Sequence, residues 1–470
     1  MATETVESSV GFRSERGPIL GALMLATALV ALDSTIIATA VLTITSNLGG
    51  FTQFPWLFSI YLLAQAVTVP VYGKLADTVG RKPVILFGIA VFALGSLLCG
   101  LATSMLGLIV FRAVQGIGAG AIQPMTMTIA GDLYTLSERA KVQGYLASVW
   151  AMSSVLGPLL GGVFAEYVDW RWIFLVNLPL SALAAWMLLR SFTESTPRRE
   201  QRVDYLGAAL LTVGAGALIL GLLEGGQAWA WSAPISIAIF AGGALVLALF
   251  VLVERRAENP ILPLWVFTRR VIVASSLVSM LVGAILLGLT SYVPTFTQGV
   301  LGTGALVAGL TVGALTLGWP LAASQAGKVY LRIGFRSTAL IGSALATLGA
   351  VSTLLIDEDS TLIQVAASCF VIGIGMGLVA TPTLIAAQTS AEWTERGVVT
   401  STNMFARSIG SAVGVAVFGA IVNARVGDTD HPAPATLSAA VHLVFVTVAV
   451  MALVMVIASA MMPSRGTNLA

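Results

Sequence analysis

Three charged residues stand deep inside long apolar stretches of the sequence: Asp33, Arg112 and Arg407. An ionisable side chain in such surroundings is costly to bury and is seldom incidental. A carboxylate there can load and release a proton when its hydration, or its distance from a guanidinium, changes. The chemistry that these residues suggest is therefore proton binding inside a membrane.

The spacing of two of these charges allows them to meet, directly or through water. Asp33 lies about 21 Å along a helix that starts at Ile19, and Arg112 about 10 Å along an oppositely directed helix that starts at Met105. In hydrocarbon about 30 Å thick, both reach a similar depth. We predict that Asp33 carries the proton and that Arg112 acts with it in coupling. The alternative is a permanent ion pair that only fixes helix packing. Arg407 has no evident acidic partner, so coupling and structural roles fit it equally well.

Other reaction chemistries find little support in the sequence. His431 and His442 are the two histidines, and Cys99 and Cys369 lie in apolar runs as buried thiols. No glycine-rich phosphate loop ends in Lys and Ser or Thr. We therefore expect no enzyme, no metal site, no primary pump, no cofactor apart from protons as coupling ion, and no nucleic-acid partner.

Long apolar runs organise the whole chain. Of its 470 residues, 57% are hydrophobic and 10% charged, with a mean hydropathy of +0.93, whereas soluble domains carry about 25% charged residues. Runs of about 20 apolar residues predict an all-α polytopic membrane protein with fourteen transmembrane helices. These spans are 19–43, 55–77, 84–102, 105–130, 140–165, 170–190, 204–224, 231–253, 269–296, 304–330, 335–356, 361–387, 397–424 and 438–462.

Basic residues fix the predicted orientation. Twenty Lys and Arg residues fall in the segments on one side of these spans, while only Arg171 and Arg425 fall on the other. By the positive-inside rule, both termini are cytoplasmic, with tails at 1–18 and 463–470. We expect a multi-pass protein of a bacterial inner membrane. Glu224 ends the seventh span, where we expect it to be solvated.

Three pairs of similar segments, one member in each half of the chain, indicate an internal repeat. The segment 73–82 resembles 327–336, 116–120 matches 373–377, and Glu138-Arg139 matches Glu395-Arg396. Repeated six-helix halves suggest a transporter with its site between them near the midplane. The predicted domains are 19–190 and 269–462, joined by a linker, 191–268, whose spans 204–224 and 231–253 form an inserted hairpin.

Several of these segments also carry sequence motifs. These motifs resemble those of the major facilitator superfamily and, within it, of the fourteen-span drug:proton antiporter family. The loop 73–82 and the segment 108–120 resemble the superfamily's signatures, and 32–37, 170–179, 204–207 and 259–264 resemble those of the fourteen-span family. The span-five signature of the antiporters is matched by Gly144, Gly157, Pro158, Gly161 and Gly162, although Ser153 replaces a glycine of that pattern.

The resemblance implies roles for two of these motifs. The loop carrying Gly73, Asp77, Gly80, Arg81 and Lys82 would act as a cytoplasmic latch that clips the halves together in the outward-facing state. The alternative is a loop that only sets topology. Leu331 occupies the position of Asp77 in the second copy, which suggests an asymmetric latch.

Gly157-Pro158 should bend span five, because proline removes a backbone donor. Together with the resemblance, this bend favours export over uptake.

The function that follows is proton-coupled antiport, by alternating access, of small amphipathic compounds that are drug-like and conceivably cationic. The alternatives are a proton-coupled uptake symporter of the same fold and a non-transporting receptor or structural protein. We expect a monomer in the lipid bilayer. Aromatic, thioether and amide side chains suit a loosely specific cavity, and the candidates are Gln65, Gln123, Trp150, Met152, Tyr292, Gln298, Met376, Asn403 and Phe405.

Overall fold

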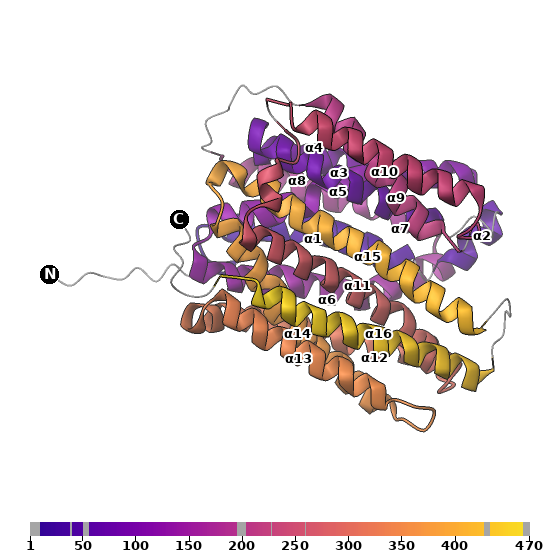
Figure 1. Cartoon of the computed structure of the whole chain (residues 1–470). Helices are drawn as coiled ribbons and strands as arrows, with labels where there is room; N and C mark the ends of the chain where they lie inside the picture. Colours follow the sequence, from indigo (N-terminus) through magenta and orange to yellow (C-terminus); the bar gives the residue numbers. More distant parts are fainter. Residues whose placement is uncertain are drawn as a thin grey trace.

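The computed structural model of the chain describes residues 10–37, 40–49, 56–194, 204–226, 228–258, 260–426 and 433–463. Within these residues the regular structure is helical, and long helices run side by side through the molecule (Figure 1). Parts of the predicted tails (1–9 and 464–470), linker residues 195–203 and His431 lie outside the described residues. The predicted all-α class is confirmed.

The first half of the chain is a bundle around an apolar core that runs from Leu20 on the first helix to Phe192, with a second apolar cluster between Ile36 and Phe174. Its long helices are apolar nearly all round, as expected of segments that face lipid on one side and other helices on the other. The helices are α1 (Gly17–Ile36), α2 (Val41–Leu48), α3 (Trp56–Val79), α4 (Arg81–Gly100), α5 (Met105–Leu133), α6 (Leu136–Tyr167), α7 (Trp172–Leu175) and α8 (Asn177–Ser191).

The second half is a matching bundle with its own core, between Val278 and Ala458. Short 3-10 helices, Leu264–Phe267, Thr353–Leu355 and Trp393–Glu395, connect or extend its elements. Its long helices are α11 (Arg270–Gly299), α12 (Ala305–Ile333), α13 (Phe335–Ser352), α14 (Leu362–Thr389), α15 (Arg396–Val426) and α16 (Pro434–Ala460).

Thirteen segments of the described chain are long and apolar enough to cross a membrane. The remaining predicted span, 140–165, corresponds to α6, a helix of 32 residues that packs against α1 and α12 but is not among the thirteen. The count of fourteen therefore stays a prediction.

The first predicted span, 19–43, is not a single helix. Helix α1 ends at Ile36, and α2 begins at Val41. The hydroxyls of Ser34 and Thr35 donate to carbonyls of the preceding turn, and Thr35 also donates to the carbonyl of Ser153 on α6. Hydroxyls that bond back in this way bend helices. An apolar run alone does not reveal this break.

The sequence repeat is also a structural repeat. A Cβ at Gly118 of α5 would lie 2.3 Å from the backbone nitrogen of Phe92 on α4. A Cβ at Gly375 of α14 would lie at the same 2.3 Å from the nitrogen of Ala346 on α13. These glycines let paired helices approach closely. The pairs α4–α5 and α13–α14 thus each have a glycine at the place where the two helices approach most closely.

Two further glycines mark equivalent turns. Gly80 precedes α4 with φ +105°, and Gly334 precedes α13 with φ +89°. L-residues with a side chain rarely adopt such angles. Both copies of the loop therefore require glycine to join their two helices.

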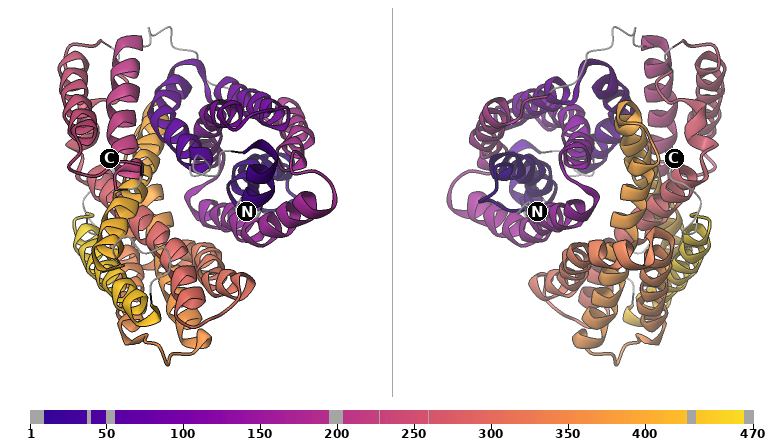
Figure 2. Two further views of the ribbon diagram at one scale, coloured as in Figure 1. Left: turned by 90° about the vertical axis from the view of Figure 1, so that its right-hand side faces the viewer. Right: turned by 90° about the vertical axis from the view of Figure 1, so that its left-hand side faces the viewer.

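The inserted hairpin consists of α9 (Tyr205–Glu224) and α10 (Pro234–Glu254), which pack against each other. Helix α9 also contacts α3 of the first half and α15 of the second, so the hairpin lies beside the junction of the halves (Figure 2). The expectation that Glu224 is solvated is wrong: it is 4% exposed, at the end of α9, a helix that packs on α3 and α10.

Candidate functional site

Asp33 and Arg112 form an ion pair inside the first half. Arg112 Nη1 lies 2.6 Å from Asp33 Oδ2, and the side chains are 1% and 0% exposed. The two charges come from α5 and α1, whose opposite directions bring them to one depth. Of the two contacts that their depth along the helices allows, the structure has the direct one.

Amides complete the surroundings of the carboxylate. Gln115 Nε2 donates to Asp33 Oδ1 at 2.7 Å, and Asn177 Nδ2 donates to the same oxygen at 3.3 Å. Gln115 Nε2 also lies 2.7 Å from the hydroxyl of Ser96 on α4. Because Gln115 is one turn beyond Arg112, both side chains lie on one face of α5. The carboxylate of α1 is therefore bonded by side chains of α5 and α8, and Ser96 of α4 contacts the amides that bond it.

Arg112 is held independently of Asp33. Its Nε donates to the carbonyl of Leu57 at 3.1 Å, and its Nη1 donates to Gln115 Oε1 at 2.7 Å. The guanidinium carbon lies 4.1 Å from the centre of the Tyr61 ring, a distance suited to cation–π attraction. The arginine can therefore stay in place while the ionisation of Asp33 changes.

Sequence reasoning missed Ser96, Tyr61 and Asn177 as members of this site. Ser96 and Asn177 are polar residues within predicted spans, and they are 0% and 1% exposed. A buried polar residue needs a hydrogen-bond partner, which is the signal that could have pointed to them.

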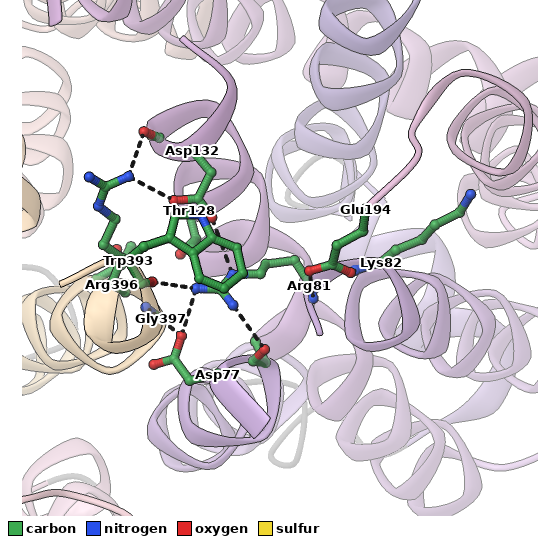
Figure 3. Close-up of polar contacts among 12 residues, drawn as sticks. Asp77, Arg81, Lys82, Thr128, Asp132, Glu194, Trp393, Arg396 and Gly397 are labelled. Carbon is green, nitrogen blue, oxygen red and sulfur yellow. Dashed lines mark hydrogen bonds and ion pairs between the residues drawn. The ribbon is translucent and has the colours of Figure 1, made fainter. Parts of the chain in front are cut away.

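A second polar cluster joins the two halves at the end of the bundle where α1 begins and α16 ends; we call this the latch end (Figure 3). Arg81, at the start of α4, is 1% exposed, with Nη2 2.9 Å from Asp77 Oδ1 and Nε 3.2 Å from Asp132 Oδ2. Its Nη2 also donates to the carbonyl of Trp393, and its guanidinium carbon lies 3.8 Å from the centre of that ring. One arginine of the first half thus touches the segment that leads into α15.

Asp77 binds the amino-terminal end of α15 directly. Its Oδ1 accepts from Gly397 N at 3.0 Å, and its Oδ2 accepts from Val398 N at 2.8 Å. Free N–H groups and the helix dipole make such an end a favourable place for a carboxylate. A Cβ at Gly73 would lie 2.8 Å from the carbonyl oxygen of Gly397. Glycine at position 73 therefore lets α3 come this close to α15.

Asp132 was not predicted as part of this cluster. Besides Arg81, it pairs with Arg396 of the second half at 3.1 Å. An acid just beyond the end of the predicted span 105–130 is a usable signal. Its partners, however, are far away in sequence and cannot be read from it.

Gly80 and Lys82 act within the first half. The backbone nitrogens of Arg81 and Lys82 donate to the carboxyl of Glu194 at 2.8 and 3.0 Å, and Lys82 Nζ donates to carbonyls at the end of α8. Within the predicted latch loop, contacts across the halves come from Gly73, Asp77 and Arg81.

Comparisons with known proteins decide the family. Residues 23–204 and 190–415 match the sequence profile of the Major Facilitator Superfamily. The chain belongs to this superfamily. It is 34% identical to Multidrug transporter protein MdtP of Bacillus subtilis (strain 168), over 91% of this chain and 79% of that protein. It is 35% identical to Multidrug resistance protein 3 of the same bacterium, over 86% of this chain and 78% of that one.

More distant proteins agree with this assignment. Efflux pump dotC of Dothistroma septosporum (strain NZE10 / CBS 128990) is 32% identical over 84% of this chain and 70% of its own length. The solved structure of the human organic anion transporter MFSD10 (TETRAN) superposes with a TM-score of 0.68, covering 95% of this chain and 99% of that one. At 14% identity this likeness shows the fold alone. As a major facilitator protein, the chain is a transporter and not an enzyme.

The glycines of the span-five signature lie along α6 of this major facilitator fold. A Cβ at Gly157 would lie 2.0 Å from Thr35 Oγ1 of α1, and one at Gly144 would lie 2.8 Å from Ser324 Cβ of α12. Gly161 is buried, while a Cβ at Gly162 would meet nothing within 4 Å. The side chain of Pro158 lies outside the described residues, and α6 is helical throughout. Gly144 therefore marks a contact between the halves.

The predicted cavity residues fall into two groups. Met376, Asn403 and Phe405 are buried: Met376 in the second core, Asn403 bonded to Ser275, and Phe405 in an apolar cluster with α3 and the hairpin. The residues of the second group are partly or fully exposed: Gln65, Gln123, Trp150, Met152, Tyr292 and Gln298.

Proposed function

We propose that this transporter exports small, amphipathic, drug-like compounds in exchange for protons. Export is supported by relatives named as multidrug transporters and efflux pumps. The latch end would face the cytoplasm, since the basic residues gather in its loops. With the latch closed, the state described here would be the outward-facing one.

The observation that carries the proton part of the proposal is the closed surroundings of Asp33. One carboxylate at 0% exposure accepts from Arg112, Gln115 and Asn177, so a change in its charge alters the bonding of three helices at once. An ion pair with only a structural role is not expected here, because apolar side chains in its place would stabilise the fold as well or better.

The effect of a proton would reach the second half through α6. Asp33 is two residues from Thr35, which donates to the carbonyl of Ser153 on α6 at 2.9 Å. Further along α6, Gly144 lies against Ser324 of α12. Protonation of Asp33 weakens its bond to Arg112, so α1 can shift, and α6 can shift with it. Release of the proton restores the ion pair and the original packing.

The experiment that tests this function is transport by purified protein in proteoliposomes. Amphipathic dyes of positive, zero and negative charge serve as probes, with a pH gradient imposed across the membrane. We expect gradient-driven accumulation of at least one probe, abolished by the proton–potassium exchanger nigericin. Equal transport with and without the gradient would rule out proton coupling.

Locking the contact between Gly144 and Ser324 should stop transport. The Gly144→Cys, Ser324→Cys protein places two thiols at the α6–α12 contact, where the Cβ atoms would lie 2.8 Å apart. A shift of about 1 Å brings them into the range of about 3.5–4.5 Å found in disulfides. Oxidation should abolish transport, and a reductant should restore it, since alternating access requires the halves to separate here. Cysteines at Gly88 and Ala121, which meet within the first half, form the control pair. A cross-linked protein that transports as fast as the same protein after reduction, or faster, would contradict this mechanism.

A further inference from the structure

The guanidinium of Arg407 has no polar partner within the described residues. Its Nε is buried without a hydrogen bond, and its central carbon lies 5.9 Å from the centre of the Trp319 ring. Other interior arginines differ. Arg81 and Arg112 pair with carboxylates, and Arg139 bonds to carbonyls. Arg407 therefore carries hydrogen-bond donors that nothing in the described chain satisfies.

Arg407 also lies near mid-depth of the second half. It is eleven residues beyond Arg396 on α15, about 16 Å along the helix, in hydrocarbon about 30 Å thick. It reaches from α15 toward α12, and these are the helices of the second half that contact α3 and α6 of the first. Its side chain thus lies at mid-depth between α15 and α12, and both of these helices contact the first half.

The charges around this position leave a positive centre. The six long helices of the second half contain no Asp or Glu. In the first half, Asp33 is enclosed by its own partners and is 0% exposed. The described polar side chains of α3 and α5 nearest this depth include the uncharged amides of Gln65 and Gln123, 3.4 Å apart. A ligand between the halves would therefore meet a cation and amides, and no free carboxylate.

A guanidinium whose Nε is buried without a partner is unfavourably placed, and a carboxylate or sulfonate is the group that relieves it best. The planar fork of arginine matches two anionic oxygens and is less strongly hydrated than an ammonium group. The indole of Trp319 lies beside the guanidinium and offers an apolar surface to the rest of a ligand.

We infer that Arg407 and Trp319 form the binding position for the anionic group of the substrate, so that the exported compounds are amphipathic organic anions. This inference rests on the proposed export function and replaces the cationic cargo that the sequence suggested.

Binding of two probes that differ only in charge tests the inference. Tritium-labelled 2-naphthoate and 2-naphthylmethylamine share a ring system, one anionic and one cationic, and their equilibrium binding can be measured on the full chain in nanodiscs. We expect wild type to bind naphthoate saturably, and Arg407→Gln to weaken it about tenfold to a hundredfold. Arg407→Lys should fall between the two, because it keeps the charge and loses the fork. The cation should bind Arg407→Gln at least as well as wild type.

Arg190→Gln is the matched control. Arg190 also lies over an indole, that of Trp186 at 5.4 Å, but at an exposed place at the end of α8. It should leave naphthoate binding unchanged. Gel filtration reports whether each variant is folded. If Arg407→Gln is not folded, the naphthoate affinity of Arg407→Lys tests the inference instead.

Absence of saturable naphthoate binding to wild type would overturn the inference, as would unchanged affinity in Arg407→Gln or, where that variant does not fold, in Arg407→Lys. Gradient-driven transport of other dyes by wild type would still stand in that case. Failure of the anion site and failure of the proposed export function are therefore distinguishable.

Discussion

The Asp33→Asn protein should lose gradient-driven transport entirely while still folding. Asparagine has the shape of a protonated aspartic acid and can still bond to Gln115 and Asn177, but it cannot exchange a proton. The pH gradient then cannot drive transport. Transport driven down a substrate gradient, or exchange of labelled for unlabelled substrate, should persist. The measurement is probe accumulation in proteoliposomes with and without a pH gradient.

Asp169→Asn is the control for this variant. Asp169 lies in an exposed turn, with its side chain 47% exposed and 3.7 Å from Arg171, so its loss should leave coupling intact. The Asp33→Asn substitution leaves Arg112 without its counter-ion, which can cost about 3–5 kcal/mol. Thermal unfolding of both variants therefore separates loss of coupling from loss of fold. Full accumulation by Asp33→Asn would remove this residue from the mechanism.

The second large effect is expected at the latch. Asp77→Asn removes the charge that accepts two backbone N–H bonds from α15 and pairs with Arg81. Each hydrogen bond to a charged group contributes about 1.5–3 kcal/mol, and about 1.4 kcal/mol is a tenfold shift in an equilibrium. The closed latch should therefore become at least about tenfold less populated, and transport should fall by a similar factor.

Thiol labelling can follow the opening of the latch. A cysteine introduced at Ser324 lies beside α6 in the closed state, and Asp77→Asn should raise its rate of labelling by a membrane-impermeant maleimide from the latch end. Asp357→Asn, an exposed acid in the loop after α13, provides the control. Unchanged labelling together with unchanged transport would show that the Asp77 contact is not a latch.

Local patterns in the sequence predicted much of this fold because apolar length and charge are local signals. The depth of Asp33 and Arg112 followed from their places along their helices, since the rise of a helix is constant. The repeat pointed to two related halves because its matching segments recur in the same order along the chain.

The rest depends on contacts between distant segments. Nothing near Asp132 in the sequence indicates Arg396, and nothing near Asp77 indicates the start of α15. The break after Ile36 arises from hydroxyl bonds to the helix's own carbonyls and to α6. Glu224 is buried because the hairpin packs against α3, a placement that composition does not encode. These residues needed the tertiary structure.

The central claim is that Asp33 gains and loses a proton as the halves close and open. Difference infrared spectroscopy tests it most directly, comparing the Gly144→Cys, Ser324→Cys protein in its oxidised, locked form with its reduced form. The account predicts a protonated-carboxyl C=O band that differs between the two forms and disappears when Asp33→Asn is added. The same carboxyl signal in both forms, or a difference that survives Asp33→Asn, would contradict it.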